Sequence, residues 1–142
     1  MKISAGTCIK FNNKLLFCHP TNASWSGTYS PAKGAVDEGE TFLQAAIRET
    51  KEEVGINIIK EQIDNLDNPI EIIYYNRKKE VHKIVYLFTV NINSLSEIGL
   101  TSEIVPQDQL QMEEVDWAGF LTRDQILEKS FHRFFPLVDL LK

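Results

Sequence analysis

The amino-acid sequence predicts an α/β fold, and two observations support that prediction. Segments rich in β-branched and aromatic residues, which favour strands, recur along the chain at 3–11, 14–18, 70–75, 81–92 and 115–120. A helix-capping pattern precedes each of two further segments, one central and one near the C-terminus. A mixed sheet between helices is the arrangement that such an alternation favours.

The first two strands are predicted to form a hairpin. Residues 3–11 and 14–18 flank Asn12 and Asn13, and asparagine tolerates the left-handed backbone that a tight hairpin turn requires. The next residues, 19–30, are polar and are predicted to form a loop.

The central helix is predicted to run from about Phe42 to Val54. Thr41 and Gln44 have the spacing of a capping box, which starts a helix just before Phe42. Gly55 suits the left-handed residue that ends it.

The second half of the chain is predicted to contain a hairpin, a loop and a final helix. Strands 70–75 and 81–92 flank a turn at Arg77–Lys79, and residues 93–111 are a long loop with at most a short strand. Strand 115–120 leads to a second capping box at Thr122 and Gln125, and Pro136 either kinks the C-terminal helix or begins a new turn.

The central helix has two chemically different faces. An apolar stripe, interrupted by one threonine, is expected to face the core: Leu43, Ile47, Thr50 and Val54. Three carboxylates share another face at i, i+3 and i+4: Glu49, Glu52 and Glu53. Ala45 and Ala46 are expected beside the acidic face, where small side chains leave room for a ligand.

Like charges at this spacing destabilise an isolated helix by about 0.2–0.5 kcal/mol per pair. Oxygen-only ligand sets of this kind attract hard dications such as Mg²⁺, so we interpret the acidic face as a metal site. The alternatives are a solvated face for Glu52 and Glu53, and for Glu49 an ion pair with Arg48 or a role as a base.

The segment Gly34–Ile56 resembles the complete box of the Nudix hydrolase family (MutT-like), G-x5-E-x7-R-E-U-x-E-E-x-G-U. Its fixed positions are Gly34, Glu40, Arg48, Glu49, Glu52, Glu53, Gly55 and Ile56. Thr50 departs from the bulky aliphatic residue that the family usually carries there.

The resemblance implies a Nudix-type α/β/α sandwich with a mixed β-sheet and hydrolysis of nucleoside diphosphates linked to another moiety. It implies Mg²⁺ or Mn²⁺ held by Glu49, Glu52, Glu53 and the backbone carbonyl of Gly34. Arg48 of the catalytic segment, with Glu40, is implied to hold the helix and the loop in place.

Three further functional residues are predicted outside the acidic face. Lys33 either contacts a substrate phosphate or lies in solvent. Tyr74 lies near the position where a tyrosine marks family members that cleave dinucleoside polyphosphates, although a strand tyrosine also serves packing. Glu103 is the first choice for a general base, ahead of Glu113 and Glu114, unless all three are solvated loop residues.

The aromatic residues of the 19–30 loop admit two interpretations. Trp25 and Tyr29 either stack on a nucleobase or, for Trp25, anchor their own loop. His19, His82 and His132 share no ligand spacing, and structural roles are expected for them.

The composition of the chain limits the classes of binding partner that we expect. The 142 residues predict a single domain over 1–142, with 15 Lys and Arg against 20 Asp and Glu, a net charge of −5 and no basic run suited to duplex nucleic acid. The absence of a signal peptide or long apolar run predicts a cytoplasmic protein without membrane association. Cys8 and Cys18 are expected to be free thiols, and a monomer or homodimer is expected.

The sequence therefore predicts a metal-dependent hydrolase that cleaves a phosphoanhydride bond in a nucleotide-derived substrate. Dinucleoside polyphosphates are favoured, while ADP-ribose, nucleoside triphosphates and RNA 5′ ends stay open. A Nudix-fold module that senses a nucleotide without cleaving it is the alternative. Such modules commonly lose box glutamates, and this chain retains them all.

Overall fold

The computed structural model describes residues 1–142 and contains a six-stranded mixed sheet of order β4-β5-β1-β2-β6, with β3 also paired to β1. The strands are β1 (Lys2–Phe11), β2 (Lys14–Pro20), β3 (Ala32–Ala35), β4 (Ile70–Tyr75), β5 (Val81–Asn91) and β6 (Val115–Leu121). The helices are α1 (Phe42–Val54) and α2 (Arg123–Lys129), followed by the 3-10 helix η4 (His132–Leu140). The sheet is mixed because β1 and β5 are parallel while the other pairs are antiparallel.

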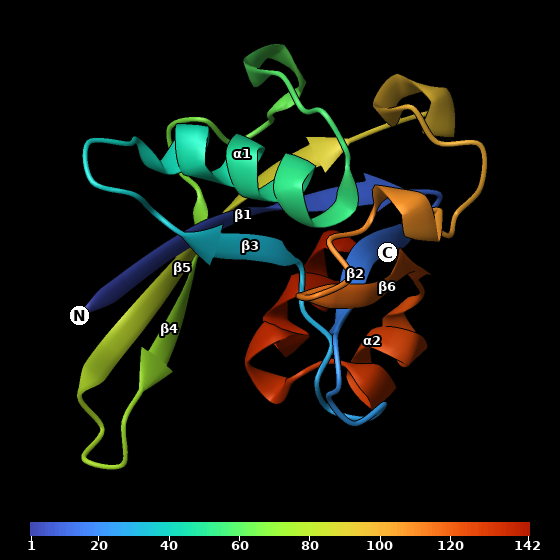
Figure 1. The fold of residues 1–142 in the computed structure, drawn as a ribbon. Coiled ribbons are helices and arrows are strands. Elements are labelled where there is room, and N and C mark those ends of the chain that lie inside the picture. The colour runs from blue at the N-terminus through green and yellow to red at the C-terminus, as the bar shows by residue number, and fades with distance from the viewer.

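Helices cover both faces of the sheet (Figure 1). On one face α1 packs over β1 and β3, and its Val54 belongs to the same apolar cluster as Ile9 and Phe88. On the other face α2 and η4 contribute Ile126 and Phe134 to a second cluster. The predicted α/β/α sandwich is confirmed.

The local signals for the hairpin and the central helix are confirmed. Asn12 and Asn13 join β1 to β2 with φ values of 50° and 58°. Thr41 accepts a hydrogen bond from the Gln44 backbone in a complete capping box, and Gly55 ends α1 with φ 68°.

Strand β3 was not predicted, because its four residues, AKGA, carry no strand signal of their own. Its pairing comes from β1, where Gly6 lies opposite Lys33. A Cβ on Gly6 would collide with the Ala32 carbonyl oxygen and with Lys33, so the missing side chain admits this strand.

The buried face of α1 differs from the predicted stripe. Ala45 and Ala46 are fully buried and do not leave room for a ligand, whereas Leu43 and Ile47 are only partly buried. The physical reason is that small residues let the helix axis approach β1 and β3 closely, and the larger side chains then lie along the edges of the contact.

The segment 93–111 contains two short 3-10 helices and one isolated bridge, between Ile104 and Gly119. Pro136 lies inside η4, where the chain continues as a 3-10 helix. No helix in the structure combines the length and the apolar character needed to cross a lipid bilayer.

Candidate active site

The site forms where β3 meets the acidic face of α1. Gly34 lies on β3 directly beside the Glu49 carboxylate, and a Cβ at Gly34 would overlap that carboxylate. Glycine is therefore required because the strand and the helix approach closely here. A left-handed backbone is not the reason, since Gly34 has no positive φ.

Arg48 connects the helix to the loop that precedes it. Its guanidinium donates to Glu40 at 2.8 and 2.9 Å and to the Ala35 carbonyl oxygen at 2.9 Å. Nη1 also donates to Glu49 at 2.8 Å and to Glu52 at 3.1 Å. The hydrogen bonds from Arg48 hold the pKa of Glu40 at about 2. The loop and the acidic face are thus fixed to each other by one cation.

Glu53 differs from its neighbours because it has no cationic side-chain partner. Its Oε1 accepts a hydrogen bond from the backbone N–H of Lys33 at 3.2 Å. Burial raises the pKa of Glu53 to about 7, and burial also raises that of Glu49. A carboxylate whose charge is this poorly solvated is a favourable place for a cation.

Two adjoining cavities contain these groups. One of about 350 Å³ is lined by Lys33, Gly34, Ala35, Glu49, Glu52, Glu53, Gln111 and Glu114. The other, of about 130 Å³, is lined by Cys18, Pro20, Ser30, Lys33, Glu53, Glu114 and Val115. Lys33, Glu53 and Glu114 line both, so the cavities form one region that extends from α1 to the end of β2.

The donors in this region suit magnesium in their chemistry. Four glutamates line the larger cavity beside Gly34, and carboxylate and carbonyl oxygens are the donors that Mg²⁺ prefers. No three His, Cys, Asp or Glu side chains are arranged to hold one ion together. Arg48 engages Glu49 and Glu52 in this arrangement.

The predicted substrate residue Tyr74 lies on β4, where two cationic side chains contact its ring. Lys83 Nζ lies 5.0 Å and the Arg133 guanidinium carbon 3.7 Å from the centroid of the Tyr74 ring. Burial, and after it the positive charges of Lys33, Lys2 and Arg133, lower the pKa of Lys83. Neither Lys83 nor Arg133 forms an ion pair with a carboxylate.

The three glutamates that are candidates for the general base lie in different environments. Glu103 forms an ion pair with Lys14 at 2.7 Å and lines neither cavity of the site. Glu113 is exposed and also lines neither. Glu114 lines both, although the sequence ranked it behind Glu103. Its position depends on how β6 pairs with β2, which no local pattern in the sequence indicates.

The two aromatic residues of the β2–β3 connection have different environments. Tyr29 is 3% exposed, so its ring is unavailable to a nucleobase. Trp25 is 58% exposed and stacks on His19, with 3.6 Å between the ring centroids. His19 therefore has the structural role that the sequence predicted.

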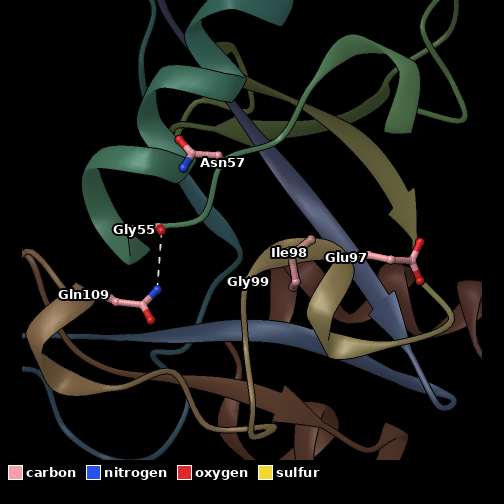
Figure 2. A pocket seen from close by; sticks show the side chains of 6 residues that line it. All are labelled: Gly55, Asn57, Glu97, Ile98, Gly99 and Gln109. Carbon is pink, nitrogen blue, oxygen red and sulfur yellow. Dashed lines mark hydrogen bonds between the residues drawn. The ribbon is translucent and has the colours of Figure 1, made fainter.

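A larger cavity of about 400 Å³ lies at the C-terminal end of α1 (Figure 2). Its one carboxylate, Glu97, accepts hydrogen bonds from the backbone N–H groups of Asn93 and Ser94. Gln109 donates to the Gly55 carbonyl oxygen at 3.3 Å across it. The Glu97 carboxylate thus stabilises its own loop, and no other titratable residue lines this cavity.

The family model that describes the NUDIX domain matches residues 1–136. The chain belongs to the Nudix family.

Curated relatives match over shorter segments. The chain is 39% identical over 75 residues to bis(5'-nucleosyl)-tetraphosphatase [asymmetrical] of Caenorhabditis elegans, covering 53% of this chain and 52% of that protein. It is 56% identical over 34 residues to dihydroneopterin triphosphate diphosphatase of Escherichia coli K12, covering 24% and 23%. The aligned segments thus span about half and about a quarter of these relatives' own lengths.

Solved structures match over nearly the whole chain. A C. elegans Ap4A hydrolase binary complex superimposes with a TM-score of 0.68 at 25% identity, covering 98% of this chain and 93% of that one. A MutT NUDIX hydrolase from Burkholderia pseudomallei superimposes with a TM-score of 0.71 at 16% identity, covering 99% and 98%. The similarity to the B. pseudomallei protein shows only that the fold is shared, because the sequence identity is low.

Proposed function

We propose that this Nudix protein is a metal-dependent hydrolase that cleaves a phosphoanhydride bond in a nucleoside diphosphate-linked substrate. The observation that carries the proposal is the cavity where Glu49, Glu52 and Glu53 of α1 meet the Gly34 backbone of β3. In the reaction, water adds to a phosphorus atom, the bond to the bridging oxygen breaks, and each product keeps one side of the anhydride.

The metal ligands in this proposal are Glu49, Glu52, Glu53 and the Gly34 carbonyl oxygen. A bound Mg²⁺ or Mn²⁺ would offset the negative charge of the phosphate oxygens and lower the pKa of a bound water. Arg48 contributes by fixing Glu49 and Glu52 in place and joining them to the loop through Glu40.

Lys33 is proposed to bind a substrate phosphate, because it lines both cavities beside Glu53. Lys83 and Arg133 extend this positive charge around Tyr74. A second set of cations beyond the metal site suits a substrate with a long polyphosphate chain. We therefore favour a dinucleoside polyphosphate, which agrees with the C. elegans tetraphosphatase relative.

For the general base, Glu114 is the candidate that the cavity geometry favours. It shares both cavities with Glu53, whereas Glu103 is held by Lys14. Its role would be to accept the proton of the attacking water.

The test is hydrolysis of a nucleotide panel with Mg²⁺ or Mn²⁺ in ¹⁸O-labelled water. The panel contains dinucleoside polyphosphates, ADP-ribose, nucleoside triphosphates and a 5′-triphosphorylated RNA. Products identified by mass give the substrate, and the labelled phosphorus gives the position of attack. We expect metal-dependent cleavage, most rapid for a dinucleoside polyphosphate. Nucleotide binding without cleavage of any member would instead support a sensing module.

A further inference from the structure

Strand β4 forms one edge of the sheet. It pairs only with β5, and no other segment forms a backbone hydrogen bond with it. One extra residue, His82, interrupts the β4–β5 pairing, and because it belongs to β5 the edge strand itself stays regular. The sequence of β4, IEIIYY, carries one charge and neither proline nor lysine, which commonly protect such edges. A regular, mainly apolar edge is a template for another strand.

A hollow of about 330 Å³ runs along this edge. Its apolar lining comes from Ile70, Ile72, Ile73 and Tyr75 of β4 and from Pro136 of η4. Successive side chains of a strand point to opposite faces, so a hollow lined by residues of both faces follows the edge of the strand. The space therefore suits an extended segment that pairs with β4 and packs beside η4.

The hairpin of β4 and β5 also exposes apolar side chains on one face. Ile73 is 37% exposed, Tyr75 is 59% exposed, and Val81, which pairs with Tyr75, is 41% exposed. The turn of this hairpin projects from the body of the fold (Figure 1). An edge-to-edge contact between two copies would place their two apolar faces side by side and shield part of each from water.

The turns at the two ends of β4 carry opposite charge. The turn after the strand contains three cations, Arg77–Lys79, and one carboxylate, Glu80. The turn before the strand, residues 64–68, contains Asp64 and Asp67 and no cation. None of these charged groups forms an ion pair within the chain. Because the turns lie at opposite ends of one edge, they meet when a second copy of that edge runs antiparallel to the first.

We propose that two copies of this chain associate through their β4 edges, antiparallel about a two-fold axis, and so form one continuous sheet. A pairing centred on Ile72 places Arg77 opposite Asp67 of the partner subunit, because both residues are equally far from the centre. The symmetry repeats this contact, so each basic turn meets an acidic turn. The occupant is a second copy because the edge is complementary to itself in charge. The inference concerns assembly and does not depend on the proposed function.

The test reverses the charges of the two turns separately. One variant carries Arg77→Glu and Lys78→Glu, and the other carries Asp64→Lys and Asp67→Lys. Sedimentation velocity over a concentration series measures association, and circular dichroism checks folding. The wild type is expected to dimerise, and each variant alone to dimerise at least about tenfold more weakly, because like charges then meet at both turns. An equal mixture of the variants is expected to form heterodimers, since both contacts of the mixed pair again join opposite charges.

Lys51→Glu combined with Lys142→Glu is the matched control. It changes the net charge by the same amount as the first variant, at exposed positions on α1 and at the C-terminus. It is expected to associate like the wild type. Hydrogen exchange is expected to show that rising protein concentration protects the amides of β4. The proposal is overturned if the wild type stays monomeric up to millimolar concentration, if the reversed variants dimerise as well as the wild type, if their mixture stays monomeric, or if association leaves β4 unprotected.

Discussion

The side-chain hydroxyls of Thr7 on β1 and Thr50 on α1 lie 2.7 Å apart within an otherwise apolar helix–sheet contact. Thr50 also donates to the Ala46 carbonyl oxygen at 2.8 Å, so Thr7 donates to Thr50. This pair accounts for the departure of Thr50 from the aliphatic residue usual in the Nudix box. The threonine is matched by a second buried polar residue on the strand that faces it.

Thr50→Val is expected to destabilise the fold by about 1–3 kcal/mol, because it leaves the buried Thr7 hydroxyl without its partner. Thr7→Val is expected to cost less, since Thr50 keeps its bond to Ala46. The double variant is expected to be more stable than Thr50→Val alone. Urea unfolding of all four proteins measures the coupling, and strictly additive losses would contradict it.

Glu53→Gln is expected to leave the fold intact and to lower turnover by about 100-fold or more, because it removes a charge placed against the reacting phosphates. The amide still accepts the hydrogen bond from the Lys33 backbone. Steady-state rates with Mg²⁺, alongside far-UV circular dichroism, provide the measurement. Glu128→Gln, an exposed carboxylate on α2, is the control, and near-wild-type rates for Glu53→Gln would refute the ligand assignment.

The metal-free protein is expected to lose stability as the pH rises from 4.5 to 7. Burial raises the pKa of Glu53 from 4.5 to about 7, so in this window the folded state binds more protons than the unfolded state. Thermal melts in EDTA measure the loss, and Glu53→Gln is expected to reduce it. Added Mg²⁺ is expected to restore stability above pH 7 by binding the folded state. Glu40 acts in the opposite direction, stabilising the fold above pH 4.5 and losing that effect toward its pKa of about 2.

Gly34→Ala is expected to abolish activity and lower the melting temperature, because the new Cβ overlaps the Glu49 carboxylate. Adding Glu49→Ala removes the obstructing carboxylate, and this double variant is expected to regain stability while staying inactive. Melting temperatures and hydrolysis rates of the single and double variants separate the two effects. A fully active Gly34→Ala protein would show that the strand and helix need not approach this closely.

Glu114→Gln is expected to reduce kcat about 100-fold or more if this carboxylate accepts the proton of water. Glu103→Gln is expected to keep kcat and to lose a little stability through its partner Lys14. The pH–rate profiles of both variants check the assignment. The reverse ranking would return the base role to Glu103.

The sequence predicted those features whose signals are local. The capping box at Thr41, the left-handed Gly55 and the asparagine turn each depend on a few neighbouring residues, and all were confirmed. The spacing of the box likewise predicted that three glutamates of α1 share one face, and in the structure Arg48 contacts two of them.

Features that depend on distant segments were not predictable. Strand β3 exists because Gly6 of β1 admits it, and the buried face of α1 depends on how closely Ala45 and Ala46 let the helix approach the two strands. Glu114 reaches the cavity through the pairing of β6 with β2. The orientation of the Trp25 ring depends on His19, on which it stacks, and Asp116 of β6 holds His19 in place.

The parallel pairing of β1 with β5 has a consequence for how the protein folds. Lys2 pairs with Lys83, so the strand that receives β3 gains its other neighbour only after more than half of the chain has been synthesised. Contacts of such sequence separation close late and slowly, whereas the N-terminal hairpin and α1 form from nearby residues. During synthesis Gly34 and the glutamate-bearing helix are therefore both made before the strand that closes the other edge of β1, so the sheet that supports the site is completed late.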